Sequence, residues 1–225
     1  MTPFAPRFDV LPRAQMALWH SLGPVARAGF VLYGGTAVAL HLGHRQSVDF
    51  DFFASEVFEP AALRTELELL RGSLLIHAAP NTLTVSLVPE GGDSPVKLSF
   101  FGGLKTGRVG DPLPSDDGLV LVASLDDLLA TKLKVLQDRV EARDYLDIAA
   151  MIRHGMSLAE GLSAAKTLYG PVFEPMIALR TVTWFADGDL SALGSADRQL
   201  LKVAASAVKV PLPTVPVRSR ALRVE

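Results

Sequence analysis

The segment from Phe30 to Phe53, FVLYGGTAVALHLGHRQSVDFDFF, constrains the fold of this chain more than any other stretch. It opens with an apolar run, Phe30–Tyr33, which is typical of a short buried strand. A Gly-Gly pair then permits a tight turn, and Thr36–Leu42 has the composition of a short helix. The Asp-Phe-Asp that follows alternates in polarity, as half-buried strands do. The segment therefore predicts a strand, a helix and a second strand in direct succession.

Two acidic residues, Asp49 and Asp51, stand two positions apart in the second predicted strand. Side chains two apart in a strand point to the same face, so Phe50 and Phe52 point the other way, into a core. Adjacent carboxylates repel when both are ionised, and a divalent cation removes that conflict. Proteins usually hold Mg²⁺ with one or two carboxylates together with substrate phosphates. The pair is therefore a candidate metal site.

Thirteen residues separate the Gly-Gly pair from the two acids. Gly34 and Gly35 allow positive φ or a close approach to a ligand, and Thr36 begins a helix whose N-terminal amides attract phosphate. A phosphate cradle followed by a metal-binding acid pair suits nucleotidyl transfer from a nucleoside triphosphate. The alternative interpretation is a tight turn and an edge strand with solvated acids.

Composition narrows the class of protein. The chain has 225 residues, 49% of them apolar, which is enough for one substantial core or a domain with an appendage. A net charge of −2 gives no general attraction to nucleic acid, and the lack of cysteine excludes disulfides and thiolate zinc sites. The N-terminus lacks the apolar run of a signal peptide, and no apolar stretch is long enough to span a bilayer. We expect a soluble cytoplasmic protein with no membrane partner.

The remaining pattern predicts an α/β fold: a small mixed sheet flanked by helices, with a helical C-terminal part. The first part, 1–120, carries two helices and three further strands. The predicted helices are Pro12–Ala28, kinked or split at Gly23-Pro24, and Pro60–Arg71; the predicted strands are Leu74–His77, Thr82–Val88 and Pro95–Phe101. The second part, 121–210, is helical, with Leu158–Tyr169, Pro175–Phe185 and Ala196–Lys209 after its first helix. The third part, 211–225, is predicted to be a flexible tail.

The first helix of the second part is predicted to run from Ser124 to about His154. At 100° per residue, Lys132, Arg143 and Asp147 fall in one sector that borders the apolar stripe, and Asp144 lies near its edge. Charges within an apolar stripe need partners. Two interpretations are open: an internal set of ion pairs, or a basic wall that faces a triphosphate.

GGTAVALHLGHRQSVDFDFF resembles motif I of the nucleotidyltransferase superfamily, and most of all the AbiEii/AbiGii-type toxins, the nucleotidyltransferase half of type IV-like toxin–antitoxin systems. The likeness covers roughly Phe30 to Ile152 and includes the segment LLATKLKVLQDRVEARDYLDIAAMI. It implies an α/β enzyme that uses Mg²⁺ or Mn²⁺ and a nucleoside triphosphate to modify an RNA, such as tRNA, or a protein. It also implies a cognate antitoxin.

The resemblance also implies roles for individual residues. Those implied to be catalytic are Asp49, Asp51, Lys132 and Asp144, the first two also holding metal. Those assigned to substrate binding are Gly34, Gly35, Thr36, Arg45, Ser47, Arg143 and Asp147.

The chain departs from the superfamily at one position. Enzymes of this kind usually carry a third carboxylate on a later strand, and alternation along Pro95–Phe101 places Ser99 there. A hydroxyl is a poor substitute for a carboxylate when two metal ions must be held. Either the enzyme works with fewer ligands, or Asp144 or Asp147 substitutes, or the protein is a non-catalytic nucleotide-binding or regulatory module. A further hypothesis is a structural protein whose acids are merely solvated.

Overall fold

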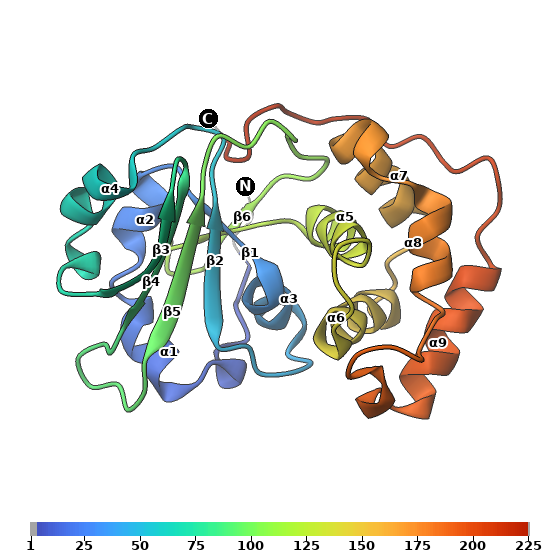
Figure 1. The fold of residues 1–225 in the computed structure, drawn as a ribbon, viewed down its shortest axis with the longest axis horizontal. Helices are drawn as coiled ribbons and strands as arrows, with labels where there is room; N and C mark the ends of the chain where they lie inside the picture. The colour runs from blue at the N-terminus through green and yellow to red at the C-terminus, as the bar shows by residue number, and fades with distance from the viewer. Residues whose placement is uncertain (1–3, 225) are drawn as a thin grey trace. The chain divides into compact units, whose positions relative to one another are not determined.

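The computed structural model describes residues 4–224, and the chain divides into two compact units (Figure 1). The first unit comprises 4–107, Asp111–Ser124 and 219–224, and the second comprises Arg108–Gly110 and Leu125–Arg218. The sequence-based division at 120 and 210 stays a prediction, and its outermost residues, 1–3 and 225, lie outside the described part. None of the described helices combines the length and apolarity that crossing a membrane requires.

The first unit is built on a seven-stranded mixed sheet with the order β3-β4-β5-β2-β1-β7-β6. The strands are β1 (Val31–Tyr33), β2 (Asp49–Phe53), β3 (Leu74–Ala79), β4 (Thr82–Leu87), β5 (Val96–Phe101), β6 (Leu113–Pro114) and β7 (Leu121–Val122). β2 runs parallel to β5 and β1 runs parallel to β7, whereas the other neighbours are antiparallel. The predicted small mixed sheet is therefore confirmed, and it places β2 at the centre.

The helices of the first unit lie on both faces of this sheet (Figure 1). They are η1 (Phe8–Val10), α1 (Arg13–Trp19), α2 (Gly23–Arg27), α3 (Gly34–Leu42), α4 (Pro60–Glu66) and η2 (Glu68–Leu70). The predicted break at Gly23-Pro24 is confirmed, because the proline stands in the first turn of α2, where its missing N–H costs nothing. The helix predicted over Pro60–Arg71 ends early, since Leu67 takes an extended backbone and a 3₁₀ turn follows.

Aromatic side chains fill the core of the first unit, on the face of the sheet against which α1 packs. Phe50 and Phe52 are buried, as the alternation along β2 predicts. The ring of Phe52 stacks on Phe100 of β5 at 5.4 Å between centroids, and Trp19 of α1 lies 6.4 Å from Phe50. Burying each such ring contributes about 2–3 kcal/mol. This packing fixes the orientation of β2, and so turns its two aspartates to the opposite face.

The second unit is helical, as predicted. Its elements are α5 (Leu125–Val135), α6 (Ala142–Arg153), α7 (Leu158–Tyr169), η3 (Gly170–Val172), α8 (Pro175–Thr181), η4 (Leu190–Ala192) and α9 (Ser195–Ser206). The sequence predicted α7 at its observed bounds, but α8 ends at Thr181 rather than at Phe185. Gly161 brings α7 close to α5, because a Cβ there would lie 2.6 Å from Leu129 Cδ2.

The prediction of one helix from Ser124 to His154 is wrong: α5 ends at Val135, and α6 begins at Ala142. The intervening residues contain no glycine or proline, so no local signal marks the break. Residues distant in sequence supply hydrogen-bond partners for groups at the break instead. Asp189 Oδ1 accepts a hydrogen bond of 2.6 Å from Ala142 N–H at the start of α6, and Gln137 Nε2 donates to Glu174 O at 2.7 Å. The sector calculated for a continuous helix therefore does not hold across residues 136–141.

The segment 211–224 carries no helix, and hydrogen bonds tie several of its residues to the rest of the chain. Ser163 Oγ donates to Pro213 O, and Thr167 Oγ1 donates to Val215 O. Nearer its end, Leu222 is buried and its amide donates to Ser55 Oγ at 2.8 Å. The part predicted as a flexible tail thus makes specific contacts in each unit.

We expect Gly161→Ala to destabilise the protein. Alanine favours a helix over glycine by about 1 kcal/mol, but overpacking a buried contact costs about 1–3 kcal/mol. Leu129 is fully buried and has little room to move, so the steric cost should exceed the gain by about 1 kcal/mol. Urea unfolding followed by circular dichroism measures the change. In a double-mutant cycle with Leu129→Ala, the cost of the added methyl group should fall; an undiminished cost would refute the contact.

Candidate functional site

The two aspartates of β2 share the face of the sheet opposite the aromatic core. In the sheet register, Asp51 lies opposite Tyr33 of β1 and Ser99 of β5, while Asp49 lies opposite Lys97 of β5. Both aspartates are partly exposed, with 23% of the Asp49 side chain accessible. The pairing of carboxylates predicted from the sequence is therefore present on an accessible surface.

The Gly-Gly pair lies directly against this surface. Gly34 is the first residue of α3 and has a φ of +73°, a conformation that favours glycine. A Cβ at this position would collide with Oδ2 of Asp51. Gly35 makes the same close approach to Arg45 and Ser47, whose guanidinium and hydroxyl a Cβ would displace. The glycines thus allow a carboxylate and a cation to lie against the beginning of α3.

Thr36 is buried and joins α3 to β2 through its side chain. Its hydroxyl donates a hydrogen bond to the backbone carbonyl of Asp49. The hydroxyl is therefore engaged within the fold, and what Thr36 offers a ligand is its backbone amide. Because α3 begins at Gly34 rather than at Thr36 as predicted, the amides of residues 34–36 belong to its first turn, which has no intrahelical acceptors.

The structure therefore brings together, around the start of α3, the residues that sequence reasoning selected in the first unit: 34–36, Arg45, Ser47 and the two aspartates.

Sequence reasoning missed Lys97 as a residue of this site. Its Nζ lies 2.8 Å from Oδ2 of Asp49, and its side chain is 42% exposed. The polar face continues across the sheet, since Ser99 lies opposite Thr84 and Thr84 lies opposite His77. Alternation along β5 did place Lys97 and Ser99 on one face. The missing information was the parallel pairing of β5 with β2, which aligns that face with the aspartates.

The donor set at β2 suits a single hard cation. Two carboxylates with solvent access match the way in which proteins hold Mg²⁺, which takes its other ligands from water and phosphate. Within residues 4–224, no three or more acidic or histidine side chains gather in a metal-binding arrangement. The residues fit an ion shared with a bound triphosphate better than a closed metal cage.

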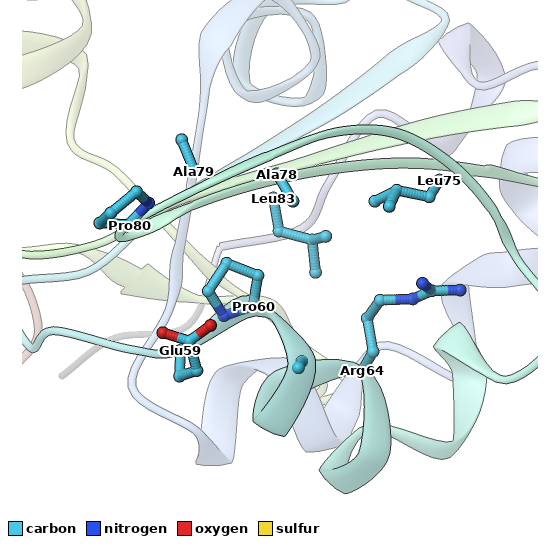
Figure 2. Close-up of a pocket in the computed structure, with 9 residues that line it drawn as sticks. Glu59, Pro60, Arg64, Leu75, Ala78, Ala79, Pro80 and Leu83 are labelled. Atoms are coloured by element: carbon cyan, nitrogen blue, oxygen red, sulfur yellow. The ribbon is translucent and has the colours of Figure 1, made fainter.

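A separate cavity of about 280 Å³ lies on the other face of the sheet. Figure 2 shows its lining coming from α4 and from the β3–β4 hairpin, with Arg64, Leu75 and Leu83 among the residues. Leu83 lies opposite Phe100 in the register and so belongs to the Phe50 face. The cavity is thus distinct from the aspartate surface.

The charged residues of α5 and α6 form a buried cluster within the second unit. Lys132, at 5% exposure, places its Nζ 2.7 Å from Asp144 Oδ1 and 2.6 Å from Asp147 Oδ2, and both acids are fully buried. Arg139 joins them, with its Nε 3.0 Å from Asp144 Oδ2. Three of the residues selected from the sequence are therefore brought together as an internal ion-pair set, one of the two interpretations left open.

Arg143 does not belong to this cluster. Its guanidinium pairs with Glu141, and half of its side chain is exposed. Asp147 pairs with Lys132 instead. Solvent therefore reaches Arg143 of α6, whereas Lys132 of α5 is enclosed. The catalytic and substrate-binding roles of both residues stay predictions.

The pKa of Asp144 is lower than that of an ordinary aspartate. Burial, the largest influence, raises the pKa, but Lys132 and Arg139 together outweigh burial by attraction and hydrogen bonding. The folded state therefore keeps this carboxylate charged, which couples it to the stability of the second unit.

We expect Lys132→Met to cost about 3–5 kcal/mol of unfolding free energy, because it removes the cation shared by two buried carboxylates and leaves Arg139 on Asp144 alone. Lys134→Met on the same helix is the matched control. Lys134 pairs with Asp138 at 2.6 Å, but that acid is 61% exposed, so the loss should stay below about 1 kcal/mol. Chemical denaturation measures both. Equal losses would contradict a structural role for the buried cluster.

Acid should weaken the second unit through Asp144. The unfolded carboxyl has a pKa of about 3.9, and the folded value is lower. The stabilisation is therefore complete above about pH 4 and is lost as the pH falls toward the folded pKa. Unfolding free energies measured from pH 6 to pH 2 should decline less steeply in Asp144→Asn than in the wild type. Parallel curves would show that Asp144 does not carry the effect.

Comparisons with known proteins agree with this architecture. The family model described as "Nucleotidyl transferase AbiEii toxin, Type IV TA system" matches residues 24–204, well over half of the chain. An uncharacterised protein, aq_aa25 of Aquifex aeolicus (strain VF5), is 27% identical over 161 residues, which cover 70% of this chain and 74% of that protein.

A solved structure is also similar. It is an antigenic nucleotidyltransferase-like protein from Paracoccidioides brasiliensis, with a TM-score of 0.54, 19% identity and coverage of 88% of this chain and 95% of that one. At this identity the likeness concerns the fold. The family match extends over the glycine pair, both aspartates and the α5–α6 segment. The chain therefore belongs to the AbiEii nucleotidyl transferase toxin family of type IV toxin–antitoxin systems.

Proposed function

We propose that the protein transfers a nucleoside monophosphate from a nucleoside triphosphate to an RNA or protein acceptor, with Mg²⁺ or Mn²⁺ as cofactor. One observation carries the proposal: Gly34 lets the start of α3 lie directly against Asp51. Backbone amides that attract phosphate and a carboxylate that attracts a metal ion are thereby adjacent. A triphosphate with its bound cation needs both partners at once.

The proposed reaction is a substitution at the α-phosphate. An acceptor hydroxyl oxygen forms a bond to the α-phosphorus, the bond from that phosphorus to the bridging oxygen breaks, and pyrophosphate leaves with the electron pair. The hydroxyl proton passes to solvent. A bound Mg²⁺ supplies charge stabilisation and alignment of the phosphates. Asp49 and Asp51 hold the ion, while the amides of Gly35 and Thr36 orient the outer phosphates.

The basic residues of the proposed site balance phosphate charge. Arg45 lies against Gly35, where its planar fork suits phosphate oxygens, and Ser47 lies beside it. In the second unit, the family resemblance assigns Lys132 and Asp144 to catalysis, and Arg143 and Asp147 to substrate binding. The same resemblance suggests a toxin with a cognate antitoxin.

Purified protein should move label from one α-labelled nucleoside triphosphate to one acceptor class when it is incubated with Mg²⁺ and either total RNA or total protein. The double variant Asp49→Asn/Asp51→Asn should lose at least about 100-fold of this activity, since it removes the metal ligands. Asp116→Asn, an exposed acid on the β6–β7 turn, is the control and should retain it. Transfer by the double variant at the wild-type rate would refute the proposal.

The register of Ser99 favours a second candidate function. This neutral residue lies directly opposite Asp51, where the superfamily usually has an acid, so a regulatory protein that binds nucleotide without turnover is the alternative. It predicts Mg²⁺-dependent nucleotide binding, measured by calorimetry, with no transfer to any acceptor. Transfer activity in the wild type would exclude this alternative.

A further inference from the structure

Lys97 places its ammonium on Asp49, one of the two proposed metal ligands. We infer that the site takes one divalent ion, and that the Lys97 ammonium takes the place of the other, as a cation that turns from Asp49 to the substrate phosphates. The inference rests on the proposed function and specifies its charge arrangement. No motif in the sequence drew attention to this residue.

Its position follows from the sheet register. β5 runs parallel to β2, so Lys97 stands opposite Asp49 and Ser99 stands opposite Asp51. The ammonium reaches Asp49 at 2.8 Å. The strand that would supply a third carboxylate therefore supplies a neutral hydroxyl beside one aspartate and a positive charge beside the other.

The charge balance argues against two ions. Two carboxylates and one ammonium leave a single formal negative charge, too little to hold two divalent cations. Replacing Ser99 with an acid and removing the Lys97 charge would restore the three carboxylates of a two-ion site. The pair formed by these two residues on one strand thus sets the number of ions.

The Lys97 side chain can also exchange partners. It is 42% exposed and Asp49 is 23% exposed, so their ion pair is solvated and easily broken. An ammonium on a flexible four-carbon stem can turn from a carboxylate to an arriving phosphate oxygen. When an ion binds the aspartates, Lys97 is displaced from Asp49 and becomes available to neutralise phosphate.

The test counts ions on the full-length protein. Mn²⁺ is titrated alone, and free Mn²⁺ is measured by electron paramagnetic resonance. The wild type should bind one ion, and Asp49→Asn/Asp51→Asn should bind none. Lys97→Met keeps the aliphatic stem but removes the competing charge, so it should bind Mn²⁺ about tenfold more tightly. Lys97→Met/Ser99→Asp should bind two ions. Thermal melts verify that each variant is folded.

The control is Lys105→Met, which removes the same charge from an exposed position after β5 and should leave Mn²⁺ affinity unchanged. Two ions on the wild type, or equal affinities of wild type and Lys97→Met, would overturn the inference. In the transfer assay, Lys97→Met should lose about tenfold or more in kcat/KM while binding the ion more tightly. A purely structural ion pair would not move these two quantities in opposite directions.

The test separates this inference from the proposed function. If the wild type transfers nucleotide but binds two ions, the inference about Lys97 is refuted and the proposed function stands. A wild type that binds no Mn²⁺ and shows no transfer refutes both.

Discussion

The alternation of aspartate and phenylalanine along β2 is the constraint on which the first unit depends. Phe50 and Phe52 are buried against aromatic rings from α1 and β5, and this packing fixes which way the strand faces. A shift of the strand by one residue would turn the two phenylalanines toward solvent and the two aspartates into the core. The apolar contacts on one side therefore hold two carboxylates at the surface on the other, where their mutual repulsion costs least.

The carboxylate surface becomes a candidate site only because other elements approach it closely. The two glycines at the start of α3 have no side chains. Asp51 can therefore lie against the helix terminus at Gly34, and Arg45 can lie against Gly35. Thr36 ties the same helix to the backbone of β2. Local geometry, rather than an unusual set of side chains, creates the combination of amides, carboxylates and a cation.

The second unit uses charge in a different way. Lys132, Asp144 and Asp147 are enclosed, and each acid is compensated by cations within hydrogen-bonding distance. Such a cluster is costly to bury and strongly damaging to break, so it specifies how α5 and α6 meet. Residues that match the family motif thus define how these two helices are held against each other. Activity alone cannot separate the two roles, whereas stability measurements can.

The sequence by itself determined the features that depend on near neighbours. The alternation along β2, the proline-marked break before α2 and the bounds of α7 were all readable, because backbone preference and side-chain periodicity are local properties. The glycine pair and the acids were recognised for the same reason, since their spacing is short and each residue type has a clear physical use.

The tertiary structure alone decided which strands and helices became neighbours. The pairing of β5 with β2 places Lys97 on Asp49 and Ser99 beside Asp51, and nothing within either strand specifies that pairing. The break between α5 and α6 likewise depends on Asp189, forty-seven residues from the amide it caps. Helix propensity predicted continuity there, but partners distant in sequence offered the freed backbone groups an alternative. Such contacts form only when the chain is folded, which is why no local pattern revealed them.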